Sequence, residues 1–146
     1  MKMKVLVASL VAAIVTIGCA SIEDRNSAAR VTTTPIDDID WLALPDGRAV
    51  STVHGDRTSG EHTTYVRFPA GMRTAVHMHS NTYDGVVVAG VARHFEPGLE
   101  ESAIWLSPGS VYRVPAETHH ISQCADESFC IFAIHQHGAL DRTVVD

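Results

Sequence analysis

Short apolar or alternating runs, each ended by a turn signal, dominate the chain from Trp41 onward. Glycine, proline, asparagine and aspartate recur between these runs, which is typical of strands joined by tight turns. This part of the sequence shows no sustained helical period, internal repeat or low-complexity segment. We predict strands over residues 49–54, 62–68, 73–79, 83–89, 91–95, 103–106, 111–114, 121–124 and 129–135. The pattern therefore predicts an all-β sandwich or barrel, and 146 residues suffice for one such domain.

The first 18 residues follow a different pattern. Lys2 and Lys4 precede an unbroken run of apolar and small residues over 5–17, which is shorter than the roughly 20 residues of a membrane-spanning helix. A basic start and a short apolar core predict a secretory signal peptide over residues 1–18. The segment Thr16-Ile17-Gly18-Cys19 resembles the lipobox of bacterial lipoproteins. This resemblance implies lipidation of Cys19, and the alternative is an ordinary signal peptide followed by an unmodified cysteine.

The residues after Cys19 predict where the protein is located. Residues 19–40 include a polar stretch rich in small side chains and are predicted to be a tether, which leaves residues 41–146 for the domain. Ala20 stands where aspartate would favour retention at the inner membrane of a Gram-negative cell. The lipoprotein resemblance therefore implies a lipid anchor in the cell envelope, on the periplasmic side of the outer membrane.

The charge balance changes if the signal peptide is removed. Both lysines are then lost, and nine arginines stand against 17 acids, for a formal charge of −8. A nucleic-acid-binding protein would need a basic face, so nucleic acid is not expected as a partner. The absence of lysine from the mature chain also excludes a lysine Schiff base.

Two cysteines remain beyond Cys19. Five residues separate Cys124 from Cys130, a spacing that suits a bridge across a hairpin loop, and an exported protein meets an oxidising environment. The alternative is a metal or redox role, but the pair is not a CxxC motif. We expect a structural disulfide.

The histidines supply the main chemical signal. His77 and His79 lie two residues apart in a predicted strand, and residues two apart face the same side of a strand. Two imidazoles on one face can bind a single divalent metal. His119-His120, about 40 residues further on, offer a third ligand.

Two segments around these histidines resemble the paired motifs of the cupin superfamily. The first motif resembles a segment that begins at Gly71, continues after five residues with His77-Met78-His79 and ends at Gly90. The second motif resembles a segment that begins at Gly109 and continues after five residues with Pro115-Ala116-Glu117-Thr118-His119-His120. The resemblance implies a cupin-type jelly-roll β-barrel over about residues 41–141. It also implies that His77, His79 and His120 bind one divalent metal ion.

Two residues compete for the position of the fourth ligand, because cupins place a glutamate after the first histidine pair and this chain has none there. Counting back from Gly90 puts Tyr83 at that position, whereas a longer gap puts Asp84 there. A carboxylate is the more usual ligand for a divalent ion, so Asp84 is predicted in the metal site and Tyr83 beside it. The upstream stretch with Gly55-Asp56, Gly60 and residues 68–71 resembles the cupin domain of anti-sigma factors.

The other histidines and the aromatic residues have simpler predicted roles. His135 lies on the last strand and is predicted either to point into the barrel, as a ligand or its neighbour, or to be an ordinary residue. His119 is expected to face away from His120, and the alternative is that the two exchange roles. The predicted surface histidines are His54, His62, His94 and His137. The predicted core and barrel-lining residues are Tyr65, Phe68, Val87, Trp105, Tyr112 and Phe132.

Three histidines and at most one carboxylate leave one or two coordination positions open, as in catalytic and ligand-binding metal sites. Fe, Zn, Mn and Ni are all compatible with such ligands. One hypothesis is a dioxygenase-like, metal-dependent enzyme, with Arg73 and Tyr83 contacting a small organic substrate. The other is a non-catalytic module that binds a metal or small ligand and signals to an envelope partner. An open pocket beside the histidines would favour the first, and cupin likeness also implies a possible homodimer.

Overall fold

The computed structural model describes residues 31–145. The predicted signal peptide, the predicted lipidation site Cys19 and most of the predicted tether lie outside the described residues. Within residues 31–145, none of the helical segments has the length and apolar character needed to cross a membrane.

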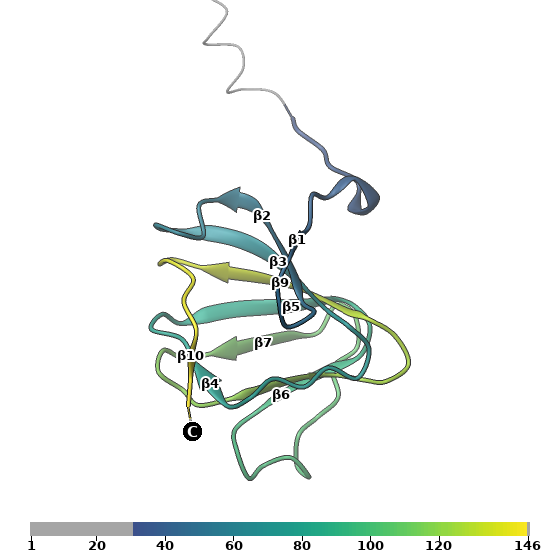
Figure 1. The fold of residues 1–146 in the computed structure, drawn as a ribbon, viewed down its shortest axis with the longest axis vertical. Helices are drawn as coiled ribbons and strands as arrows, with labels where there is room; N and C mark the ends of the chain where they lie inside the picture. Colours follow the sequence, from purple (N-terminus) through teal and green to yellow (C-terminus); the bar gives the residue numbers. More distant parts are fainter. Residues whose placement is uncertain (1–30, 146) are drawn as a thin grey trace, which may run out of the picture. The chain divides into compact units, whose positions relative to one another are not determined.

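Ten strands and one short helix make up the described chain. They are a 3₁₀ helix η1 (Ile36–Asp38), then β1 (Leu42–Ala43), β2 (Ala49–Gly55), β3 (His62–Phe68), β4 (His77–Met78), β5 (Tyr83–Ala89), β6 (Ala92–Phe95), β7 (Val111–Val114), β8 (Ile121–Cys124), β9 (Cys130–Gln136) and β10 (Thr143–Val144). Strands β1-β2-β3-β9-β5-β7 form one antiparallel sheet, and β10-β4 and β6-β8 form two smaller ones. The large sheet curves over the smaller pairs and closes a barrel (Figure 1). The prediction of an all-β fold is confirmed.

The predicted strands agree with the structure where turns on both sides limited them. Strands β3, β5, β7 and β8 have the predicted bounds. The predicted strand over 103–106 is wrong, since only Leu106 forms an isolated bridge, with Ala92. That segment belongs instead to the loop between β6 and β7 (Figure 1). The strand predicted over 73–79 is reduced to His77–Met78, because only these two residues pair with β10.

Alternation along the strands separates the core from the outer face. Every second residue of β3, from His62 to Phe68, is buried, and those between are partly or fully exposed. Phe68, Val87 and Phe132 lie in the core, as predicted. Tyr65 does not, because it falls on the outward-facing positions of β3. Trp105 is also not in the core, since 44% of its surface is exposed and the Arg93 guanidinium lies over its ring, 4.6 Å from the centroid.

One predicted surface histidine is fully buried. His62 has no exposed surface because it takes an inward position of β3, and its Nδ1 lies 2.9 Å from the hydroxyl of Thr64. Burial lowers the pKa of the His62 imidazole. The residue therefore contributes a neutral imidazole to the interior of the barrel.

The expected disulfide is present. Cys124 at the end of β8 is bonded to Cys130 at the start of β9, with Cα atoms 5.8 Å apart and no exposed surface on either residue. A loop of this size restricts the unfolded chain enough to stabilise the fold by about 2 kcal/mol. The bond holds β8 next to the central strand β9, and the segment just before β8 carries His120.

Candidate metal centre

The structure brings the three predicted histidines together at one end of the barrel. His77 opens β4 and His120 directly precedes β8, and the two exchange backbone hydrogen bonds of 3.1 and 2.9 Å. His79 follows β4 on the same side as His77. The ring centroids are 4.2 Å apart for His77 and His120, and 5.2 and 5.4 Å from His79 to these two rings. One ring nitrogen of each lies within 4.8 Å of the others, so the three side chains can bind one metal ion.

Backbone carbonyls hold all three rings in one orientation. The Nδ1 atom of His77 lies 3.0 Å from the carbonyl oxygen of Ala75, and that of His120 lies 2.9 Å from the carbonyl oxygen of Thr118. The Nδ1 atom of His79 bonds the carbonyl of Asp141. A carbonyl only accepts hydrogen bonds, so each Nδ1 carries the proton and each Nε2 has an unprotonated lone pair. This second layer of contacts is typical of metal-binding imidazoles.

Burial also keeps these rings neutral. Burial, together with the neighbouring His120 when that ring is charged, lowers the pKa of His77 to about 3. Burial is the main cause of the lowered pKa of His79 and of His120. Neutral imidazole is the form that binds metal, so the three ligands need no proton release near pH 7.

Tyr83, not Asp84, lies beside the three histidines. Strand β5 alternates, and it points Tyr83 inward, with 3% of its surface exposed, and Asp84 outward. The Tyr83 hydroxyl lies 3.1 Å from Nε2 of His120 and donates to it. Burial raises the pKa of Tyr83, so the group is a neutral phenol. Asp84 instead pairs with Arg113, whose Nη1 lies 3.0 Å from its carboxylate, and the prediction that Asp84 is a metal ligand does not agree with this geometry.

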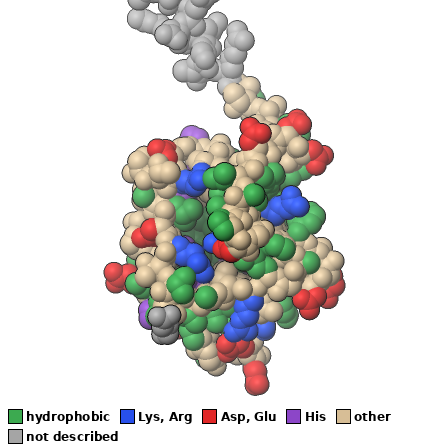
Figure 2. Space-filling view, viewed as in Figure 1, with side chains coloured by type: hydrophobic (Ala, Val, Ile, Leu, Met, Phe, Trp, Pro, Cys, Tyr) green, Lys and Arg blue, Asp and Glu red, His purple; other side chains and the backbone are tan. Residues whose placement is uncertain are grey.

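Arg73 does not point toward the histidines either. Its guanidinium pairs with Glu100 at 3.0 Å and lies over the Phe95 ring, 5.2 Å from the centroid. Basic and acidic side chains are interspersed over the face shown in Figure 2. The predicted contact of Arg73 with a small organic substrate is therefore not supported by its position, because its charge is already paired with Glu100.

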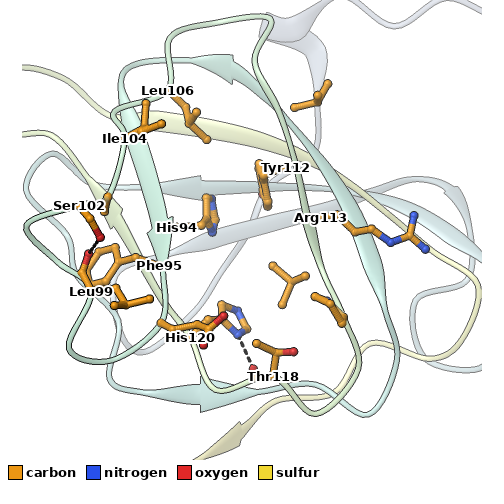
Figure 3. A pocket seen from close by; sticks show the side chains of 15 residues that line it. His94, Phe95, Leu99, Ser102, Ile104, Leu106, Tyr112, Arg113, Thr118 and His120 are labelled. Carbon is orange, nitrogen blue, oxygen red and sulfur yellow. Dashed lines mark hydrogen bonds between the residues drawn. The ribbon is translucent and has the colours of Figure 1, made fainter.

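A pocket of about 410 Å³ opens next to His120. It lies between β6, β7 and the loop that joins them, and its lining is mainly apolar. The lining side chains include His94, Phe95, Leu99, Ser102, Ile104, Leu106, Val111, Tyr112, Val114, Thr118 and His120. Figure 3 shows His94 and Tyr112 side by side at the centre of the pocket, while Arg113 points away from them. The pocket is large enough for a small organic molecule.

His94 and Tyr112 form the wall between this pocket and a smaller cavity of about 60 Å³ that His77 and His79 line. Their rings are stacked, with centroids 3.8 Å apart. Nδ1 of His94 bonds the Ser122 hydroxyl at 3.0 Å, but Nε2 of His94 and the hydroxyl of Tyr112 are buried without a partner among residues 31–145. Buried polar atoms rarely stay unpaired, which makes both atoms candidates for contact with a ligand.

Sequence reasoning missed His94, which we expected at the surface. The alternation of the predicted strand did not indicate its position, because the larger apolar residues Val91 and Phe95 alternate with Ala92 and His94. Burial lowers the pKa of His94 to about 3, with a further contribution from His120. His135, in contrast, points outward, and the expectation that it could line the barrel is wrong because it falls between the inward residues Ile134 and Gln136.

Residues 29–140 match the protein family described as the ChrR Cupin-like domain. The chain is a cupin. Its barrel is similar to an RmlC-like cupin from Ralstonia eutropha, with 24% identity, a TM-score of 0.60 and coverage of 83% of this chain and 80% of that chain. It is also similar to the polyketide cyclase RemF from Streptomyces resistomycificus, with 13% identity, a TM-score of 0.63 and coverage of 80% of this chain and 87% of that chain.

A third cupin neighbour is the DMSP lyase DddQ from Ruegeria pomeroyi, with 17% identity, a TM-score of 0.58 and coverage of 73% of this chain and 61% of that chain. At these identities the likeness shows the fold alone. No curated protein sequence matches the chain significantly. The predicted jelly-roll barrel is confirmed, and the activity must be inferred from the site itself.

Gly85 makes room for the wall of this cupin's pocket. A β-carbon on Gly85 would overlap the phenol ring of Tyr112, lying 2.6 Å from its Cε1 atom. The ring cannot retreat easily, because His94 is stacked on it and Phe132 packs against it edge-on at 6.2 Å. Gly85→Ala is therefore expected to lower the free energy of unfolding by about 1–3 kcal/mol, measured by urea denaturation.

The matched control for this substitution is Gly60→Ala, because no atom lies within 4 Å of a β-carbon there. We expect it to change stability by less than about 0.5 kcal/mol. In a Tyr112→Ala background, Gly85→Ala should cost much less, since the overlapping ring is gone. Equal stability of wild type and Gly85→Ala would show that the wall formed by His94 and Tyr112 is not tightly packed.

Proposed function

We propose that this cupin is an envelope lipoprotein whose barrel binds one divalent metal ion and acts on a small organic molecule. The observation that carries the proposal is the set of three anchored imidazoles whose Nε2 atoms carry no proton, next to a mainly apolar pocket of about 410 Å³. The signal-like pattern that ends at Cys19 supports the lipid anchor and a periplasmic location.

The donor set fits a divalent transition metal. Three neutral imidazoles are suitable ligands for Zn, Fe and Ni, and also bind Mn. The nearby phenol of Tyr83 is a poor ligand while it keeps its proton, which leaves positions for a substrate or water. When bound, such a metal supplies a Lewis acid that polarises an oxygen atom of the substrate.

The residues of the pocket indicate what kind of molecule fits. The mainly apolar lining suits an apolar body. The Tyr112 hydroxyl has no partner, and burial raises its pKa well above the usual range, so it can donate a hydrogen bond to the substrate. The unpaired Nε2 of His94 offers a second polar contact. We infer a small substrate with an apolar part and one oxygen-bearing polar end.

A second candidate function follows from the acid–base properties of the pocket. The lowered pKa of His94 and the raised pKa of Tyr112 leave neither group ready to exchange a proton near pH 7. This observation favours a non-catalytic module that binds a small ligand next to the metal. Turnover of a panel of small hydroxy and keto acids by the metal-loaded protein distinguishes the two functions.

Cobalt substitution tests whether the coordination sphere is open. We expect the visible absorption of the Co²⁺-loaded protein to change on addition of benzohydroxamate, a metal-binding probe, and on addition of acetohydroxamate only at higher concentrations. The reason is that the phenyl group can enter the apolar pocket. Absence of a spectral change with both probes would indicate a closed metal site and contradict the proposal.

Two matched substitutions locate the phenyl group. Ile104→Asp places a charge in the pocket lining and should remove the preference for benzohydroxamate. Val53→Asp changes another exposed apolar residue, on β2, and should leave the preference unchanged. Equal effects of the two substitutions would mean that the probe does not use this pocket.

A further inference from the structure

A second group of side chains that could bind a metal lies on the outer face of the large sheet, where β3 begins and β9 ends. Glu61 directly precedes β3, His135 is the last residue but one of β9, and His137 directly follows β9. Their neighbours His62 and Gln136 are fully buried and paired across the two strands. Since side chains alternate, Glu61, His135 and His137 must point away from the interior.

The register of the two strands brings the three side chains together. Thr63 is paired with His135 and His62 with Gln136, so the next position on each chain sets Glu61 across from His137. His135 is then the diagonal neighbour of Glu61. Opposite and diagonal positions of an antiparallel pair are within reach of long side chains.

The distances agree with a metal site better than with hydrogen bonds. Nε2 of His135 and Nδ1 of His137 lie 3.5 and 3.7 Å from the same carboxylate oxygen, Oε1 of Glu61. An N–H donor normally lies 2.7–3.2 Å from its acceptor. Two ligands of a tetrahedral Zn²⁺ lie about 3.3 Å apart, given bonds of about 2.0–2.1 Å. All three ligand atoms lie within 4.8 Å of one another, so small side-chain movements would complete the site.

One of the imidazoles is already oriented by a neighbour. Nδ1 of His135 lies 3.3 Å from the Thr63 hydroxyl, on the same outer face. A hydroxyl that accepts from Nδ1–H leaves the Nε2 lone pair directed toward Glu61. This contact orients the ring of His135 in the same way as the backbone carbonyls orient the three histidine rings inside the barrel.

We propose that Glu61, His135 and His137 form a second site for a divalent transition-metal ion, such as Zn²⁺, on the exterior of the barrel. The site is independent of the interior histidines because it lies on the opposite face of the sheet. Side-chain exposures of 61%, 42% and 80% for Glu61, His135 and His137 leave coordination positions open to water or to a donor from another molecule.

Zinc titration of the full-length chain, purified without a histidine tag, tests the proposal by calorimetry. We expect two binding events in wild type. The variant H135Q/H137Q should lose one of them, with affinity reduced by at least about tenfold, and E61Q should weaken the same event. The control H119Q, which changes an exposed histidine outside both clusters, should retain both.

The two metal sites can fail separately. The exterior site is refuted if H135Q/H137Q binds Zn²⁺ with the stoichiometry and affinities of wild type. It is supported if H77A/H120A retains one event that the added H135Q/H137Q removes. Broadening of the amide signals of Thr63 and His135 by Cu²⁺ gives a further readout that does not depend on the interior variant. Failure of the interior site would appear instead as equal zinc stoichiometry in wild type and H77A/H120A.

Discussion

Replacing both His77 and His120 by alanine is expected to abolish tight metal binding in the barrel. Wild-type protein should retain about one equivalent of Fe, Zn, Mn or Ni after dialysis against a weak chelator, and the variant should retain none in the barrel. The reason is that only His79 would remain of the three ring nitrogens that lie within 4.8 Å of one another. A single imidazole does not hold a divalent ion against a chelator. Elemental analysis measures the outcome.

The control for this prediction is His119→Ala, which removes the exposed neighbour of His120 and leaves the three buried rings in place. The weak chelator removes metal from exposed positions, so that the interior site is measured alone. Circular dichroism must show that the double variant keeps its strands. A folded double variant with the metal content of wild type would mean that the three histidines are not the metal site.

The fold could be predicted because its signals are local. The sequence of β3 alternates loosely over seven residues and that of β5 is rich in valine, and Pro108-Gly109 and Pro115 lie on either side of the short strand β7. The error over residues 103–106 has a physical reason. A short apolar run is also what a pocket-lining loop presents, and Ala103, Ile104 and Leu106 line the pocket without a full strand partner.

The candidate site could be predicted only in part. The spacing of His77 and His79 places them on one side, but a one-residue choice between Tyr83 and Asp84 reverses which side chain faces inward. That choice depends on the register of β5 against β9, which pairs Tyr83 with the fully buried Gln136. Such pairing joins residues more than 50 positions apart, and no local pattern determines it.

The orientation of the rings required still more distant contacts. Ala75 and Thr118 lie two residues before the histidines whose Nδ1 they bind, so these contacts are local. Asp141, which binds His79, lies 62 residues from it and is positioned by the pairing of β10 with β4. The carboxylate of Asp141 also accepts a hydrogen bond from the backbone N–H of Ser80 at 3.0 Å. The segment after β9 therefore completes the metal centre, although it contains none of the predicted ligands.

Acid is expected to destabilise the metal-free protein at a pH where most carboxylates are still ionised. Burial lowers the pKa of His94 and of His77 to about 3, and lowers the pKa of His79, His120 and His62 as well. In the unfolded chain a histidine has a pKa near 6.5. The unfolded state therefore binds more protons below pH 6.5, and stability falls as the pH decreases. Each histidine that stays neutral in the folded state contributes up to about 1.4 kcal/mol per pH unit.

His94 provides the sharpest test of this pH dependence. Between pH 6.5 and 4.5 its neutral form alone accounts for a loss of about 2 kcal/mol, a large part of the 5–15 kcal/mol typical of a domain. In His94→Gln the free energy of unfolding, measured by urea denaturation after metal removal, should fall less steeply over this range. The control His119→Gln, an exposed position, should follow wild type. The lowered pKa values of Asp46, Asp56 and Asp141 act in the same direction but only as the pH falls through about 4. Equal slopes for His94→Gln and wild type above pH 4.5 would therefore mean that His94 takes up a proton without unfolding, and its unpaired Nε2 would then be a donor in the pocket.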